Sequence, residues 1–211
     1  MKYIGVSGYA RSGKNLFAEI LKDILENEYN KKVIIKSLAD KLKQDLQGFI
    51  PRLNFYTNNT QEKNLIRPLM IAYGNLMRNI SETTHWTSYL DEELNKIKDK
   101  YDFVIIPDIR YNTSDKDECK WIQDKHNGKV IHIERFSYDN LPNILKKKGV
   151  SKTGTTKYYQ EAPNDVELLN DPLVRRSCDI NVEWEYIDNA DVNTEKLREV
   201  VRNTLKQLEI V

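Results

Sequence analysis

The chain has 211 residues, enough for one sizeable domain that buries its own core without disulfides or a structural metal. Its 33 Lys and Arg balance 32 Asp and Glu, and Lys146–Lys148 is the only dense basic run, so we expect no nucleic-acid partner. No stretch of about 18 apolar residues is present and Met1–Val6 lacks a signal-peptide pattern, so we expect no membrane partner and a cytoplasmic location. Cys119 and Cys178 lack metal-ligand spacing, which is typical of reduced thiols.

Short runs rich in β-branched residues alternate with longer amphipathic stretches along the chain. The expected strands are Lys2–Val6, Val33–Ser37, Phe103–Pro107, Val130–Glu134 and Asp179–Trp184. The expected helices are Lys14–Asn27, Lys41–Gly48, Pro68–Ile80, Thr84–Lys98, part of Asp115–His126, and Thr194–Leu208. Because Phe103–Ile106 is apolar throughout, its strand should lie at the centre of the sheet, covered on both faces. The alternation predicts an α/β fold with an open, parallel, five-stranded sheet.

Two segments are too long to be simple connections between a strand and a helix. Residues 49–100 hold two helical patterns, and we interpret this segment as a substrate-binding insertion. Residues 136–178 are polar and irregular, and a long segment of this kind in a compact domain is usually functional, so we interpret it as a lid. We therefore predict one domain over residues 1–211, whose core comprises 1–48, 101–135 and 179–211.

The segment Gly8–Lys14 has the spacing G-x4-G-K of a P-loop, a phosphate-binding turn. The glycines let successive N–H groups point at phosphate oxygens, the following helix directs its positive end there, and Lys14 adds a full charge. A strand precedes the segment and an amphipathic run follows it, which favours a P-loop over a glycine-rich turn with a chance lysine. The residues that we expect around the phosphates of a bound nucleoside triphosphate are Gly8, Tyr9, Ala10, Arg11, Ser12, Gly13, Lys14, Asn15 and Leu16.

The position after the P-loop lysine is usually Ser or Thr, whose hydroxyl binds Mg²⁺, but here it is Asn15. Asparagine offers a neutral carbonyl oxygen, which binds the metal directly or through water. Asn15 therefore leaves two interpretations open: a metal-assisted enzyme, and a protein that binds a nucleotide without transferring a phosphoryl group.

Asp108 and Arg110 directly follow the buried strand Phe103–Pro107. Ligands of open α/β sheets bind at the carboxyl ends of the strands, so both side chains are candidates for the site. The carboxylate of Asp108 is suited to hold Mg²⁺ directly or through water, and Arg110 is suited to neutralise charge on a phosphoryl group. The alternative is a simple turn in which Arg110 pairs with Asp108.

Further candidates lie in or beside the insertion. Arg67 and Arg78 would lie about 16 Å apart along an unbroken helix, so they would contact different parts of a ligand rather than one phosphate. Both arginines could instead be ordinary surface residues. Trp86 is suited to stack on a nucleobase or to pack in the core. Asp40 either contacts a sugar or base or caps the helix that follows it.

Several motifs occur in an order that is similar to one known family. They are the P-loop, Ser37–Lys43, Arg67 with Leu69 and Met70, Gly74 with Arg78, Trp86, Ile105–Tyr111 and Val130–Arg135. In this order they resemble the phage-type deoxynucleoside monophosphate kinases of the P-loop nucleoside monophosphate kinase group. The resemblance implies a three-layer P-loop NTPase-type fold, ATP as donor, a deoxynucleoside monophosphate as acceptor, and Mg²⁺. A phage-encoded kinase of this kind would act in the host cytoplasm.

The resemblance also implies roles for single residues. It places Asp108 and Arg110 near the transferred phosphoryl group; with the P-loop, the residues predicted for catalysis are Lys14, Arg11, Asp108 and Arg110, with Asn15 and Asp108 at the metal. We add Arg135, the last residue before the lid segment, to the ATP site, because lid closure would bring it to the phosphates. For the acceptor the resemblance implies Arg67 and Arg78, and the full predicted set is Asp40, Lys43, Arg67, Arg78 and Trp86. A different acceptor, such as dephospho-coenzyme A, stays open, and so does assembly as a homodimer.

Overall fold

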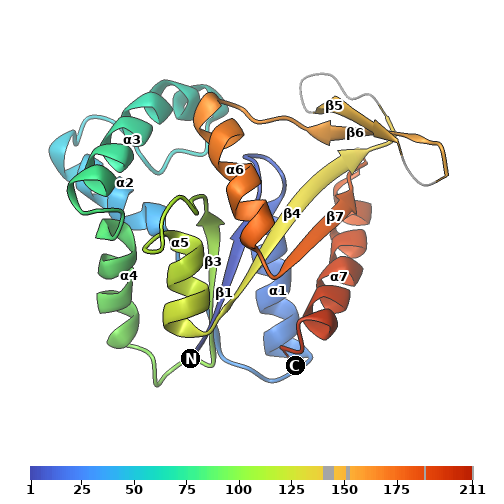
Figure 1. Ribbon diagram of the computed structural model, residues 1–211, viewed down its shortest axis with the longest axis horizontal. Helices are drawn as coiled ribbons and strands as arrows, with labels where there is room; N and C mark the ends of the chain where they lie inside the picture. Colours follow the sequence, from blue (N-terminus) through green and yellow to red (C-terminus); the bar gives the residue numbers. More distant parts are fainter. Residues whose placement is uncertain (140–144, 151–152, 188, 211) are drawn as a thin grey trace.

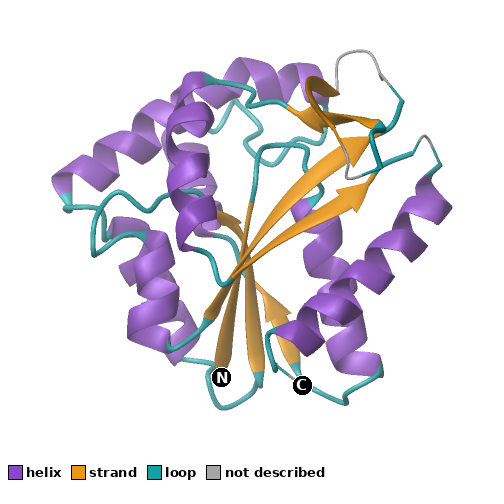
Figure 2. Ribbon diagram, turned by 45° about the vertical axis from the view of Figure 1, so that its right-hand side comes forward, coloured by secondary structure: helices purple, strands orange, loops and turns teal. Residues whose placement is uncertain are grey.

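The computed structural model describes residues 1–139, 145–150, 153–187 and 189–210, and for residues 145–148 it describes the backbone only (Figure 1). The side chains of the basic run Lys146–Lys148 therefore lie outside the described part of the chain. Helices cover both faces of a central sheet, which gives three layers (Figure 1, Figure 2).

The strands are β1 (Lys2–Ser7), β2 (Val33–Ile35), β3 (Phe103–Ile109), β4 (Lys129–Ser137), β5 (Leu145–Val150), β6 (Thr156–Gln160) and β7 (Ile180–Glu185). The helices are α1 (Lys14–Asn27), α2 (Leu38–Phe49), α3 (Thr60–Ile80), α4 (His85–Asn95), α5 (Glu118–Lys120), α6 (Asp165–Ser177) and α7 (Ala190–Gln207), and a π-helical turn, η1 (Trp121–Lys125), continues α5. None of the helices in the described ranges combines the length and the apolar character needed to cross a bilayer.

All five predicted strands are present, and they run parallel in the order β2, β3, β1, β4, β7. The sheet is nevertheless mixed and seven-stranded, because the hairpin β5–β6 joins it antiparallel to β4, with Phe136 opposite Tyr159. The prediction of a purely parallel, five-stranded sheet is therefore wrong. The hairpin strands read Leu145–Val150 and Thr156–Gln160, and they lack the continuous apolar run that marks a strand buried on both faces.

Strand β3 shows how the two faces of the sheet are filled. Phe103 and Ile105 join a core cluster with α1 and α7, whereas Val104 and Ile106 join a second cluster with α2, α4 and η1. Side chains alternate between the faces of a strand, so an apolar run supplies both clusters at once. The four side chains are at most 2% exposed, and β3 lies between β2 and β1, so the predicted internal position of this strand is confirmed.

Helix α1 begins at Lys14 as expected, whereas α2 and α3 begin earlier than expected. Helix α2 begins at Leu38 rather than Lys41, because Ser37 caps it: the Ser37 hydroxyl accepts the N–H of Ala39, and the Asp40 carboxylate accepts the N–H of Ser37. Helix α3 begins at Thr60 because the side chain of Asn59 caps it by accepting the N–H groups of Gln61 and Glu62, so Pro68 lies inside the helix rather than at its start. Local capping chemistry decided both boundaries, and the apolar periodicity did not show it.

The segment 136–178, interpreted as a lid, holds the end of β4, the hairpin β5–β6 and helix α6. The parts of this prediction that fall on residues 140–144 and 151–152 lie outside the described residues. Helix α6 packs against β1, in front of the sheet in the view of Figure 1, and it contributes side chains to the main cavity.

Candidate functional site

The P-loop segment connects the end of β1 to the start of α1 and curls tightly. Gly8 and Gly13 have φ angles of 135° and 93°, a region that favours glycine. A Cβ at Gly8 would lie 2.3 Å from the carbonyl oxygen of Ile133, and a Cβ at Gly13 would lie 2.7 Å from the Trp184 ring. The indole N–H of Trp184 donates to the carbonyl oxygen of Ser12 at 2.9 Å, which stabilises the conformation of the loop. Gly8 and Gly13 are therefore required for two reasons: their positive φ angles, and the lack of room for a Cβ atom.

Lys14 is the first residue of α1, and its side chain folds back over the loop. Its Nζ donates to the carbonyl oxygens of Gly8 at 2.6 Å and Tyr9 at 2.7 Å. Burial, together with the nearby Arg110 guanidinium, lowers the pKa of Lys14 to about 8. A buried ammonium group beside a helix N-terminus is well suited to pair with an anion.

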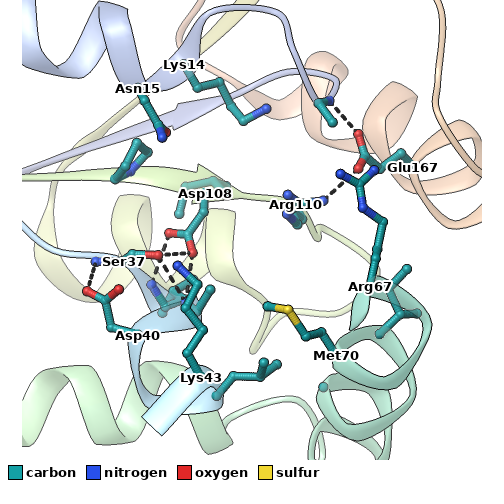
Figure 3. Close-up of a pocket in the computed structure, with 18 of the residues that line it drawn as sticks. Lys14, Asn15, Ser37, Asp40, Lys43, Arg67, Met70, Asp108, Arg110 and Glu167 are labelled. Carbon is teal, nitrogen blue, oxygen red and sulfur yellow. Dashed lines mark hydrogen bonds and ion pairs between the residues drawn. The ribbon is translucent and has the colours of Figure 1, made fainter. Parts of the chain in front are cut away.

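A cavity of about 900 Å³ opens from the P-loop toward α2, α3 and α6. Figure 3 shows Lys14 and Asn15, at the start of α1, on the upper side of this cavity. Asp108 in β3 and Arg110 just after it lie in the middle of the view. Lys43 on α2 and Arg67 on α3 lie on the side opposite to Lys14. The predicted site residues that line it are Gly8, Ala10, Arg11, Gly13, Lys14, Asn15, Leu16, Asp40, Lys43, Arg67, Arg78, Trp86, Asp108 and Arg110. The fold therefore brings most of the predicted residues to one place.

Three predicted residues, Tyr9, Ser12 and Arg135, line a small second hollow instead. Arg135 donates to the side chain of Gln160 at 2.6 Å, and its guanidinium lies over the Tyr186 ring at 4.7 Å. Burial and the positive charge of Arg11 lower the pKa of Arg135. In this arrangement Arg135 neighbours the P-loop but does not face the main cavity.

Asp108 lies within β3 and is tied to the start of α2. Its carboxylate accepts hydrogen bonds from the Ser37 hydroxyl at 2.6 Å and from the backbone N–H groups of Leu38 at 3.0 Å and Ala39 at 2.9 Å. Arg110 does not pair with Asp108 in the structure. It forms an ion pair with Glu167 of α6 at 2.8 Å, and its side chain remains 45% exposed in the cavity.

Glu167 is a residue of this site that the sequence did not reveal. Its carboxylate accepts the N–H of Ala10 in the P-loop at 2.6 Å as well as the Arg110 guanidinium. Burial alone would raise its pKa, but Arg110, the Ala10 amide and Lys14 outweigh burial, so the pKa of Glu167 lies below its ordinary value. Asn164, whose side chain accepts the N–H of Glu167, gives a local sign of a helix start, but nothing local indicates that this helix faces the P-loop.

Arg78 reaches the cavity wall but its charge is already paired. It is 7% exposed and forms an ion pair with Asp117 at 2.6 Å, with Glu118 at 3.6 Å, and a stacking contact with the Tyr111 ring at 3.7 Å. Glu118 also accepts the N–H groups of Arg110 and Tyr111, so it fixes the turn that follows β3. Burial raises the pKa of Glu118 to about 7.

The remaining predicted acceptor residues differ in whether their side chains already have hydrogen-bond or ion-pair partners within the described structure. Within the described ranges, Arg67 forms no hydrogen bond or ion pair, and Figure 3 shows it extending from α3 into the cavity. Lys43 lies 5.9 Å from the Tyr56 ring and forms no ion pair with a described residue. Trp86 is 5% exposed and donates to the carbonyl of Gly74 at 3.3 Å, so it packs in the core with one edge at the cavity. Asp40 belongs to the cap of α2.

The residues around the P-loop suit the phosphates of a nucleotide better than they suit a metal held by protein alone. Among the described residues, no group of three or more His, Cys, Asp or Glu side chains could hold a metal ion. The Asn15 side chain makes no hydrogen bond to any described residue and lines the cavity, so its carbonyl oxygen is available as a ligand. The Asp108 carboxylate already accepts three hydrogen bonds, which compete with a direct metal bond.

Comparison with known proteins gives little beyond this geometry. No protein-family model matches the sequence, and no curated protein is significantly similar to it. Among solved structures, the shikimate kinase from Aquifex aeolicus aligns over 98% of this chain and 96% of that chain, with 16% sequence identity and a TM-score of 0.39. At this level the alignment assigns neither a family nor an activity to the present chain.

Proposed function

We propose that the protein is an ATP-dependent kinase of a small phosphorylated metabolite, and specifically a (deoxy)nucleoside monophosphate kinase that converts a dNMP to a dNDP. One observation carries this proposal: the P-loop with Lys14 faces, across a single cavity of about 900 Å³, a second wall that carries Lys43 and Arg67. Two cationic walls are what the transfer of a phosphoryl group between two anionic substrates requires.

At the donor side, the P-loop N–H groups and Lys14 would bind the β- and γ-phosphates of ATP. Arg110, which opens into the cavity, would neutralise charge on the transferring group. Mg²⁺ would supply further charge neutralisation at the phosphates, and Asn15 and Asp108 are the residues of the predicted set whose oxygens would hold it, directly or through water. Arg11, at the exposed tip of the loop with φ 69°, would reach the phosphates from outside.

At the acceptor side, neither Arg67 nor Lys43 forms an ion pair with a described residue, and Figure 3 shows Arg67 extending from α3 into the cavity. A phosphate that enters beside Arg67 would gain a charge-assisted, bidentate contact. The cavity lining also includes apolar side chains of one core cluster, against which a nucleobase would pack: Leu42, Phe55, Ile66, Met70 and Trp86. The acceptor phosphate would point toward the P-loop and its base toward these apolar side chains.

A coupled assay of ADP formation with ATP, Mg²⁺ and a panel of nucleoside monophosphates tests the proposal. We expect turnover with at least one deoxynucleotide, and Arg67→Ala should raise its KM about tenfold or more, because it removes a charged contact to phosphate. Arg52→Ala is the matched control, since Arg52 is exposed in the same insertion and does not line the cavity. Absence of ADP formation above background with every acceptor would refute the proposal.

Two alternatives use the same site. A kinase of dephospho-coenzyme A would show turnover with that acceptor in the same panel and none with nucleoside monophosphates. A nucleotide-binding protein without transfer activity is favoured by Asn15 and by the three hydrogen bonds that occupy Asp108. It predicts ATP binding that is insensitive to Mg²⁺ and, in a folded protein, to Asp108→Ala.

A further inference from the structure

The carboxylate of Glu167 occupies two hydrogen-bond donors of the P-loop site. It accepts the Ala10 N–H at 2.6 Å and the Arg110 guanidinium at 2.8 Å, and it helps to keep Lys14 charged. The Glu167 side chain is only 9% exposed. Backbone N–H groups of a P-loop and a cavity arginine are the donors that a phosphate oxygen would use. A carboxylate and a phosphate cannot occupy these donors at the same time.

Helix α6 is held against the site largely by polar contacts. Glu167 and Val174 are its only buried residues among those described, and Leu168 and Leu169 are 55% and 72% exposed. Further along the helix, Asp171 contacts His132 at 3.0 Å. Because little apolar surface is buried near its N-terminus, the first turns of α6 depend on the Glu167 contacts for their position.

We propose that Glu167 is an internal competitor of the nucleotide phosphates, which holds α6 against the empty P-loop and is displaced when a polyphosphate binds. Displacement of Glu167 makes both the Ala10 N–H and the Arg110 guanidinium available to the ligand. Binding of the polyphosphate is therefore coupled to the release of Arg110. A protein whose binding-competent state is only partly populated shows a reduced apparent affinity, in proportion to that population. Removing the competitor should therefore tighten polyphosphate binding. The inference rests on the P-loop part of the proposed function and does not require phosphoryl transfer.

Calorimetric titration with inorganic tripolyphosphate at pH 7 tests the competition directly. Glu167→Gln keeps the size and shape of the side chain but removes its charge, and we expect it to bind tripolyphosphate about tenfold more tightly than the wild type. Asp165→Asn is the matched control, because it removes an exposed charge from the same turn of α6 and should leave the affinity unchanged. Thermal unfolding of each variant verifies that it is folded.

Unchanged or weaker binding by folded Glu167→Gln would overturn the inference, and so would the absence of tripolyphosphate binding to both proteins. Hydrogen exchange of the wild type gives a second readout. Amides of residues 165–171 should exchange faster when tripolyphosphate is bound, whereas slower exchange would mean that α6 closes on the ligand with Glu167 in place. Binding that follows the expectation while every acceptor fails in the kinase assay would refute the proposed activity and leave the role of Glu167 standing.

Discussion

Replacement of Asp108 by alanine separates a structural role of this carboxylate from a chemical one. Asp108 joins β3 to the N-terminus of α2 by accepting the N–H groups of Leu38 and Ala39 and the hydroxyl of Ser37. The first N–H groups of a helix have no partner within the helix, so they depend on an acceptor of this kind. In Asp108→Ala the hydroxyl of Ser37 still accepts the Ala39 N–H, but the Leu38 N–H loses its acceptor.

The expected loss of stability follows from these contacts. Loss of a helix cap costs about 1 kcal/mol, and loss of a hydrogen bond to a charged acceptor costs about 1.5 to 3 kcal/mol when the donor is left without a partner. Asp108 is half-buried at a cavity wall, so water replaces part of what is lost. We expect Asp108→Ala to lower the free energy of unfolding by about 2 to 3 kcal/mol, which for a chain of this size lowers Tm by about 4 to 12 °C.

Thermal and urea unfolding followed by circular dichroism measure this effect. Asp40→Ala is the matched control, because Asp40 accepts a single hydrogen bond at the same helix end and should cost less than Asp108→Ala. A Tm of Asp108→Ala within about 1 °C of the wild type would refute the structural role. If activity were then lost in the stable variant, Asp108 would act directly at the phosphates or the metal.

Two further predictions concern the P-loop. In the proposed site the protonated amine of Lys14 would bind phosphate, and burial lowers its pKa to about 8 in the free protein, so the Kd for ATP should rise by up to about tenfold per pH unit above pH 8. Calorimetry between pH 7 and pH 9.5 measures this rise in Kd. As a control, Lys14→Ala should bind ATP weakly at every pH. A wild-type Kd that does not change over this pH range would contradict the role of the Lys14 charge in ATP binding. Gly8→Ala should abolish ATP binding and destabilise the fold by about 1 to 3 kcal/mol, because its Cβ meets the carbonyl of Ile133 at a positive φ. Gly48→Ala, in α2 with open space around it, should stay within about 1 kcal/mol of the wild type, and equal effects of the two substitutions in urea unfolding would disprove the steric account.

The sequence by itself determined the parts of the protein whose pattern is local. The parallel strands could be predicted because β-branched, apolar runs such as Phe103–Ile106 must be buried on both faces of a sheet. The P-loop could be predicted because a strand, two glycines, a lysine and an amphipathic helix follow one another at fixed spacing. The structure has Gly8 and Gly13 at positive φ in that loop. Whether these residues bind ATP stays a prediction that the assays above address.

Only the tertiary structure decided which distant residues complete the site. Glu167 reaches Ala10 and Arg110 across 157 and 57 positions of the chain, and Asp108 reaches Leu38 across 70. Periodicity and spacing report the environment of one element, whereas these contacts depend on how the crossovers stack the elements over the sheet. The sequence did not predict the hairpin β5–β6, because its strands lack an apolar pattern of their own. The hairpin belongs to the sheet through the pairing of β6 with β4, which is a contact between distant parts of the chain.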